Sequence, residues 1–415
     1  MSEQMRKYIN LIAILGIIAF FSCSSPSGSG DVFTPGSGTR EDPFKVYNVT
    51  TLERVGKETT VDGWNLSAHY LQTAHITLPE LVSGNNWVRI GTDAEPFTGS
   101  YDGGGFTIVN LCIDDDTPGE SQGMFGCISG DAIYYGVIKN LGLVGGIISG
   151  GGDTGGIVGL NDGSMVSHCF TTGDITGSGY VGGIAGINRR NSTGTNSGTV
   201  QNCYTTGNIK STSNCQAGGI VGQNYSSLSV GAMVQNCYTT GNVTTSGTGG
   251  GGGVAGNNSW STVQYCYAAG NVIIAPSWAG GIVGVGSGSG STAPVVQNCA
   301  AVNESIMGGF ASSNMGRIGP YTVGAAGNSR NNYGREPITM LDRLNNPYTP
   351  SPGLTTIDGE DISAAEWGDP DWWTNNGNWY NAGWNPNIWD FSVVDGINLP
   401  ILKNMPGGIQ NPRVK

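Results

Sequence analysis

Charged residues and histidines are scarce in this sequence of 415 residues. Lys, Arg, Asp and Glu make up 12% of it, against about 25% in typical soluble domains. None of the three histidines (His69, His75 and His168) is followed by Glu, so the HExxH motif is absent. This excludes the zinc peptidases that depend on that motif.

Carboxylates that could act in pairs are equally few. Between residues 151 and 300 the charged residues are Asp153, Asp162, Asp174, Arg189, Arg190 and Lys210. Enzymes that cleave polysaccharides bring two carboxylates together at one sugar. Only Asp162 and Asp174 are candidates for such a pair, and other repeats fill their turn positions with Asn or small residues. The sequence therefore predicts no catalytic residue, no enzyme activity and no cofactor.

Three short motifs match functional patterns by spacing alone. Ser121 stands in GESQG, but a nucleophile elbow needs a helix after it and the strand-like MFGC follows. GGGDTG at residues 150–155 has GxGxxG spacing without a following helix. An acidic cluster offers oxygen ligands of the kind that Ca²⁺ binds, with a solvated loop as the favoured alternative; its members are Asp114, Asp115, Asp116 and Glu120. We expect no metal site.

Long hydrophobic runs are also missing. The apolar run from Ile9 to Phe21 follows Arg6 and Lys7, is too short to span a bilayer, and has the form of a secretory signal. It resembles a bacterial lipoprotein signal in which Cys23 becomes the acylated first residue, although Phe20 stands where an aliphatic residue is usual. The alternative is an ordinary cleaved signal peptide with an incidental Cys23.

Glycine, in contrast, is abundant, at 71 residues. A short string recurs between Asn110 and Asn331 with a period of about 30 residues, which indicates a solenoid. Its copies are IVNLC (108–112), IKNLG (138–142), VSHCF (166–170), VQNCY (200–204 and 234–238), VQYCY (263–267), VQNCA (296–300) and SRNNY (329–333). A GGIVG-like string precedes each later copy, and GDI, GNI or GNV follows several of them.

Aligned copies give columns with a physical meaning. The first column is β-branched and predicts a buried strand. Three places later, cysteine replaces leucine as core filler: Leu111, Leu141, Cys169, Cys203, Cys237, Cys266 and Cys299. Two inward positions three residues apart require a bend between them. The intervening residues tolerate left-handed backbone and predict a corner with a stacked asparagine ladder: Asn110, Asn140, His168, Asn202, Asn236, Tyr265, Asn298 and Asn331.

Three short strands and their corners describe one coil. The sequence predicts an all-β chain, a right-handed parallel β-helix of roughly eight or more coils with capped ends. Stacked residues lie about 4.8 Å apart, which exceeds the Cβ separation of about 3.8 Å in a relaxed disulfide. Free buried thiols are therefore favoured over column disulfides, with Cys215 as the exposed thiol.

The string GGIVGLNDGSMVSHCFTTGDITG at residues 155–177, with its copies, resembles the GLUG-motif repeats of bacterial surface proteins. Such repeats also accompany IgA-cleaving metallopeptidases. The resemblance extends less strictly to residues 96–111 and 389–402. It implies a β-helical scaffold, and no peptidase site because HExxH is absent.

The chain is expected to contain five segments. These are a signal peptide (1–22), a Ser/Gly-rich tether (23–38), an N-terminal cap with the first coils (39–104), the repeats (105–335) and a Trp-rich capping region (336–415). Short helices are expected over residues 49–58 and from Ser363. Six tryptophans crowd the last segment: Trp367, Trp372, Trp373, Trp379, Trp384 and Trp389.

Two interpretations of these tryptophans remain open. They plug the end of the β-helix, with Trp389 and Phe391 as the plug, or they form an exposed platform for a sugar or a protein. The platform residues would be Trp372, Trp373, Trp379 and Trp384, with Trp372 and Trp373 the better candidates for exposure.

Together these features predict a non-enzymatic, lipid-anchored surface protein. It would act as an adhesin or rigid display scaffold in the bacterial cell envelope, facing outward from the outer membrane. The partners would be the membrane, through the lipid, and a host glycan or matrix protein, while the net charge of −12 argues against nucleic acid. The alternatives are a carbohydrate-binding protein that uses the C-terminal tryptophans and a β-helical polysaccharide-active enzyme.

Overall fold

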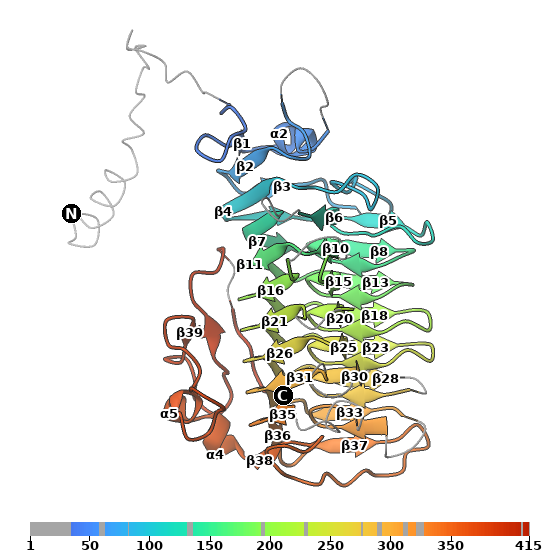
Figure 1. The fold of residues 1–415 in the computed structure, drawn as a ribbon, viewed down its shortest axis with the longest axis vertical. Helices are drawn as coiled ribbons and strands as arrows, with labels where there is room; N and C mark the ends of the chain where they lie inside the picture. The colour runs from blue at the N-terminus through green and yellow to red at the C-terminus, as the bar shows by residue number, and fades with distance from the viewer. Residues whose placement is uncertain are drawn as a thin grey trace, which may run out of the picture. The chain divides into compact units, whose positions relative to one another are not determined.

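The chain folds as a parallel β-helix, as predicted. A computed structural model describes residues 35–57, 63–81, 83–130, 136–191, 196–227, 231–274, 277–288, 293–309, 314–320, 328–407 and 410–414. Residues Gly36–Lys415 form one compact unit, in which short strands stack coil upon coil (Figure 1). Cys23 and the signal segment lie outside the described residues. Within the described ranges no helix is long and apolar enough to cross a bilayer.

Four parallel sheets, named A to D here, make up the walls. Within a coil the chain passes through sheet D, sheet B, the two short strands of sheet A, and sheet C. Sheet B contains β6 (Phe125–Ser129), β10 (Val158–Asp162), β15 (Ala185–Arg189), β20 (Val221–Tyr225), β25 (Ala255–Ser259) and β30 (Val283–Ser287). Sheet D contains β9 (Thr154–Gly155), β14 (Val181–Gly182), β19 (Ala217–Gly218), β24 (Gly251–Gly252), β29 (Ala279–Gly280) and β34 (Met315–Gly316).

The other two sheets are longer. Sheet C stacks eight strands, consistent with the predicted number of coils: β5 (Ile113–Asp115), β8 (Ile147–Gly150), β13 (Asp174–Gly177), β18 (Ile209–Ser211), β23 (Val243–Thr245), β28 (Val272–Ile274), β33 (Ser305–Met307) and β37 (Thr339–Leu341). Sheet A begins with β1 (Phe44–Val46), β2 (His69–Gln72), β3 (Ile76–Thr77), β4 (Ser100–Val109) and β7 (Val137–Val144).

From β11 on, a corner divides each coil's contribution to sheet A. The strands are β11 (Met165–Ser167), β12 (Phe170–Thr171), β16 (Thr199–Gln201), β17 (Tyr204–Thr205), β21 (Met233–Gln235), β22 (Tyr238–Thr239), β26 (Thr262–Gln264), β27 (Tyr267–Ala268), β31 (Val295–Gln297), β32 (Ala300–Ala301), β35 (Ser329–Arg330), β36 (Tyr333–Arg335) and β38 (Glu360–Ile362). The valine column is in register, since Val166, Val200, Val234, Val263 and Val296 pair in sequence.

The predicted corner is confirmed by its backbone. Residues between the paired strands have φ between 47° and 56°, in the left-handed region: Asn140, His168, Asn202, Asn236, Tyr265, Asn298 and Asn331. Asn110 also has positive φ, but its place in this column was wrong. A register shift between Asp102 and Phe106 pairs Ile108 with Leu143, so Asn110 lies beside Gly145 at the next corner.

The predicted ladder does not run through the whole of this corner. Asn202 contacts His168 of the preceding coil at 3.1 Å, as a ladder requires, but Asn140 donates to Asp102 and Asn298 donates to the Tyr380 carbonyl. A continuous asparagine ladder exists instead on sheet B, where all four members are fully buried. Nδ2 of each donates to Oδ1 of the next at 2.7, 2.8 and 2.9 Å, along Asn161, Asn188, Asn224 and Asn258.

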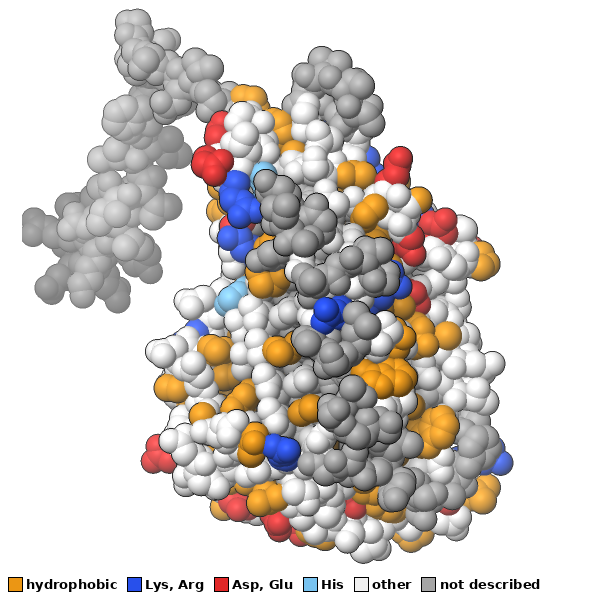
Figure 2. Space-filling view, in the orientation of Figure 1, with side chains coloured by type: hydrophobic (Ala, Val, Ile, Leu, Met, Phe, Trp, Pro, Cys, Tyr) orange, Lys and Arg blue, Asp and Glu red, His pale blue; other side chains and the backbone are white. Residues whose placement is uncertain are grey.

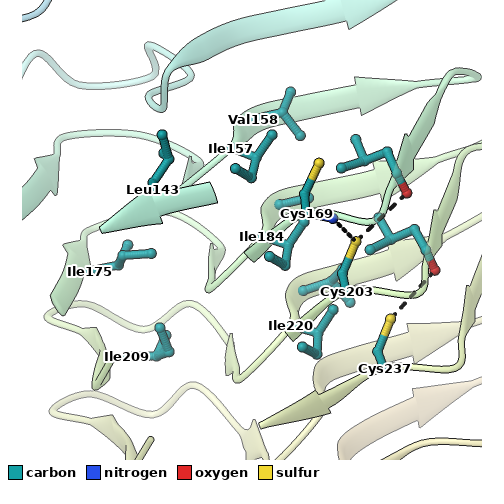
Figure 3. Packing of buried hydrophobic residues seen from close by; sticks show 14 of the residues in the cluster. Leu143, Ile157, Val158, Cys169, Ile175, Ile184, Cys203, Ile209, Ile220 and Cys237 are labelled. Atoms are coloured by element: carbon teal, nitrogen blue, oxygen red, sulfur yellow. Dashed lines mark hydrogen bonds between the residues drawn. The ribbon is translucent and has the colours of Figure 1, made fainter. Parts of the chain in front are cut away.

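The cysteine column is core filler, as predicted. Figure 3 shows Cys169, Cys203 and Cys237 one above another, next to a column of isoleucines. All five column cysteines are fully buried, and each thiol donates to the carbonyl two residues earlier at 3.1–3.3 Å. The eight described cysteines are free, and Cys215 is the one that is not buried. Burial raises the pKa of Cys169.

Both predicted short helices are present. α2 (Val49–Arg54) begins at a capping box in which Asn48 and Thr51 bond reciprocally. α4 (Ala364–Trp367) begins after Ser363, whose backbone N–H donates to Glu366 at 2.8 Å, and α5 (Pro370–Thr374) follows. Between them and the end of the chain, β39 (Trp389–Asp390) and β40 (Ile401–Leu402) form an antiparallel pair.

A buried arginine ties together the last coils. Arg317 is fully buried, donates to four backbone carbonyls at 2.9–3.2 Å, and pairs with Asp361 at 2.6 Å. Its own N–H donates to the Asp358 carboxylate at 3.0 Å. Because its donors reach carbonyls of β36 and of the residues just before β38, the side chain links the last coils, where the valine and cysteine columns have ended.

Candidate functional site

The Trp-rich segment lies along the flank of the β-helix, in contact with sheet A (Figure 1). Trp373, Trp379 and Trp384 are at most 3% exposed, and Trp372 is half-buried against Tyr333. Trp389 is fully buried and Phe391 is 8% exposed. The expected platform is therefore wrong for the three buried rings. The expected plug is wrong too, because the rings cover a side of the solenoid and not its end.

An aromatic stack on sheet A receives this segment. Phe170, Tyr204, Tyr238 and Tyr267 stack at 4.8–4.9 Å with interplanar angles of 1–6°. Such stacked rings present one continuous apolar strip. Hydroxyl groups fix the segment that covers it: Tyr267 donates to the Pro400 carbonyl at 2.7 Å, and Tyr238 donates to Gln410 at 3.0 Å.

Residues at the left-handed corner of sheet A also bind the Trp-rich segment. Asn298 donates to the Tyr380 carbonyl at 3.0 Å and Asn331 donates to the Asn378 carbonyl at 3.0 Å. Tyr265, which interrupts the asparagines, reaches the Ala382 carbonyl at 3.3 Å. The tryptophans and the outer side of the corner therefore form a second core, and this surface is structural.

The two candidate carboxylates do not meet. Asp162 is on β10 in sheet B and pairs with Arg189 at 2.9 Å. Asp174 begins β13 in sheet C, and its carboxylate accepts the Asn208 N–H at 2.8 Å. They belong to different sheets of the coil and each has its own partner, so they make no pair for acid–base chemistry.

Arg89 occupies the position proposed for a cation in the acidic cluster. Its guanidinium pairs with Asp115 at 3.3 Å and with Glu120. Hydrogen bonds from Thr117 lower the pKa of Asp115, so the carboxylate is ionised beside the arginine. Among the described residues no group of three or more His, Cys, Asp or Glu side chains is arranged to hold a metal ion.

The other spacing motifs lie in β-structure. Ser121 is 3% exposed and is followed by β6, not by a helix. The GGGDTG segment runs from the end of β8 into β9. Neither has the strand–turn–helix geometry that its motif requires.

The outer face of sheet B is the surface with the most repeated geometry, and we call it the B face. One row pairs in register through Leu160, Ile187, Gln223, Asn257 and Val285. The next row pairs through Asp162, Arg189, Tyr225, Ser259 and Ser287. The buried asparagine ladder lies between these rows in the sequence, so the strands are held in register from inside.

Aromatic side chains border the B face on both sides. Tyr225 and Trp260 meet edge to face at 5.9 Å, and both are half-buried. On the other side, Tyr180 packs against Leu160 and Ile187. Trp278 is 38% exposed. Across the whole view of Figure 2, hydrophobic side chains are scattered among uncharged polar ones, and charged side chains are few.

Gly250 leaves room for a side chain of the B face. A Cβ built on Gly250 would lie 2.5 Å from Val285 Cγ2, so a larger residue there would collide with Val285. Burial raises the pKa of Tyr180, whose hydroxyl lies near Gln223.

Sequence reasoning missed the B face because its residues vary from coil to coil. The available signal was an asparagine that recurs two positions after four of the GGIVG-like strings, within GLN, GIN, GQN and GNN. This asparagine marks the strand of sheet B in each of these coils. Trp260 and Trp278 of the B face stand alone in the sequence, whereas six of the ten tryptophans cluster between Trp367 and Trp389.

Comparisons with known proteins find a crystal structure of similar fold and two curated proteins of similar sequence. The chain matches a Bacteroides ovatus crystal structure, provisionally described as an immunoglobulin A1 protease, at a TM-score of 0.55 and 22% identity, covering 89% of this chain and 94% of that one. It is 30% identical over 135 residues to halomucin of Haloquadratum walsbyi and 28% identical over 138 residues to a protein of Evansella cellulosilytica provisionally described as a Gly-rich membrane protein.

These matches to curated relatives are partial. They cover 31% and 33% of this chain, but 1% of halomucin and 15% of the Evansella protein. No family model matches the chain, so the resemblance to GLUG-motif repeats stays a prediction. What the comparisons establish is the β-helical architecture of the chain.

Proposed function

We propose that this chain is a non-enzymatic binding scaffold of the bacterial cell envelope, an adhesin or display module anchored by a lipid on Cys23. The observation that carries the proposal is the B face. Its outward side chains pair in register across five consecutive strands. A fully buried asparagine ladder links the first four of these strands. A rigid array of this kind suits binding, because its side chains are already ordered before the ligand arrives.

Charge pairing favours a scaffold over an enzyme. Asp162 is bonded to Arg189, and Asp115 and Glu120 are bonded to Arg89. A carboxylate that is paired with a guanidinium is a poor general base, because the ion pair has to break before the carboxylate can accept a proton from a substrate. The membrane description of the Evansella relative agrees with an envelope location.

The anchor and the binding role have separate tests. A palmitate analogue fed to cells should label the full chain and leave Cys23→Ser unlabelled; equal labelling of both would disprove the anchor. Protease added to intact cells should remove the protein if it faces outward.

For the binding role, the purified full chain is screened against glycan and matrix-protein arrays and incubated with the glycans that it binds. We expect binding without release of new reducing ends. Release of reducing ends would disprove the non-enzymatic part, and binding to nothing on either array would disprove the scaffold.

A further inference from the structure

We propose that the B face binds an uncharged linear polysaccharide, laid across the strands from β15 to β30. This inference rests on the proposed binding function and names its ligand class. It uses residues that the tryptophan-rich segment does not cover: Tyr180, Tyr225, Trp260 and Trp278 as ring contacts, with Gln223 and Asn257 between them.

The spacing of the rings favours an extended ligand. Tyr180 precedes β14 and Trp278 precedes β29, three coils further along sheet D. At about 4.8 Å per coil these positions are about 14 Å apart along the solenoid axis. Tyr225 and Trp260 stand on adjacent coils at the opposite border. Sugar rings stack their C–H faces on aromatic side chains, and only an oligomer reaches all of these rings.

The floor between the rings carries the groups that sugar hydroxyls need. Gln223 and Asn257 pair in register at the centre, and both are partly exposed. Amides donate and accept, as hydroxyl groups do. Ser259 Oγ lies 2.6 Å from Ser287 Oγ and bonds Asn257 Oδ1 at 2.5 Å, which fixes the polar edge of the floor.

The charge of this floor decides the class of polysaccharide. Along β20, β25 and β30 the two outward rows contain Gln, Asn, Val, Tyr and Ser, without a charged residue. On β15 the same row contains Arg189, whose guanidinium is paired with Asp162 at 2.9 Å. A polyanion would find no unpaired cation in these rows, whereas a neutral glycan needs none.

Backbone geometry positions one ring of the B face. Trp260 has φ 51°, in the left-handed region. In two other coils the position after the same strand is Gly163, with φ 72°, and Gly288, with φ 141°. The left-handed backbone turns the chain at the end of β25 and leaves the Trp260 ring beside Tyr225.

The test is affinity electrophoresis of the purified full chain in native gels that contain laminarin, yeast mannan, xylan or dextran, with polygalacturonate as the anionic comparison. We expect retardation by at least one neutral polysaccharide and none by polygalacturonate. The double variant Tyr225→Ala/Trp278→Ala should raise the apparent Kd at least tenfold. Tyr47→Ala removes an equally exposed aromatic, 37% exposed beside α2, and should leave the Kd unchanged.

Three results would overturn the inference: no retardation by any neutral polysaccharide, retardation by polygalacturonate alone, or a Kd within twofold of wild type for the double variant while circular dichroism shows an intact fold. If the first of these results is accompanied by binding to a matrix protein that the double variant retains, the inference is overturned and the scaffold proposal stands. Conversely, loss of glycan binding in the double variant together with cleavage of that glycan by the wild type would support this inference and disprove the non-enzymatic function.

Discussion

Replacing Asn224 by Ala should weaken the centre of the β-helix more than any change at the predicted corner. The Asn224 amide is fully buried. Its Oδ1 accepts from Asn188 at 2.8 Å, and its Nδ2 donates to Asn258 at 2.9 Å and to the Thr262 carbonyl at 3.1 Å. Alanine leaves the Asn258 oxygen without its ladder donor and interrupts the ladder in the middle.

The magnitude follows from those orphaned groups. A buried polar group that loses its partner costs about 1–3 kcal/mol, so one or two such groups predict a loss of about 2–4 kcal/mol. Asn236, at the corner, provides the matched comparison because it is half-exposed with φ 51°. Asn236→Gly should be nearly neutral, since glycine adopts this backbone freely, and Asn236→Ala should cost about 1–2 kcal/mol.

Guanidinium unfolding followed by far-ultraviolet circular dichroism measures the three variants. The free energies of unfolding can be compared only if unfolding is two-state, and long repeat arrays can lose this behaviour. The test is that hydrogen exchange of the middle coils gives the same guanidinium midpoint as circular dichroism. The reasoning fails if Asn224→Ala lies within about 0.5 kcal/mol of wild type, the usual range of neutral surface changes, or if Asn236→Ala costs more than Asn224→Ala.

Three further predictions concern other parts of the described structure. Iodoacetamide at pH 8 should modify Cys215 in the native protein and spare the buried column, whereas labelling of Cys169 at a comparable rate would contradict its raised pKa and burial. Arg317→Met should destabilise the protein by about 3–5 kcal/mol, because four backbone carbonyls lose their side-chain donor and Asp361 loses its partner; a neutral result in thermal unfolding would refute this. The lowered pKa of Asp115 implies stability that is complete above its ordinary value of 3.8 and lost as the pH falls through the folded-state value. Asp115→Asn should therefore unfold more easily than wild type at pH 7, with the difference vanishing toward pH 2, and a difference that persists there would exclude the carboxylate as its cause.

The aligned repeats predicted the side-chain columns correctly from Val166 onward and incorrectly for the first copy, IVNLC. Val166 to Val296 pair as their strings align, and the cysteines between them are buried as predicted. The IVNLC string contains the same β-branched residue and asparagine, but the shift after Asp102 moves it to the neighbouring corner. Two different corners of one coil accept the same residue types, so similarity of a five-residue string does not identify the corner.

The asparagine ladder shows a second limit. Asparagine at the corner satisfies a backbone requirement, the left-handed φ, and this leaves its side chain free to bond elsewhere. Asparagine on sheet B satisfies a side-chain requirement, a buried amide stacked on its neighbour. Both appear in the sequence as a recurring Asn, and only the direction of the side chain distinguishes them.

The sequence by itself determined the solenoid, its corner and its core columns, because residues one period apart become neighbours in space when coils stack in register. The tertiary structure alone decided what covers the outside. Tyr267 meets Pro400 across a separation of 133 residues, and no periodicity connects them. The burial of the tryptophan cluster therefore follows from non-repeating contacts between the C-terminal segment and the stacked coils.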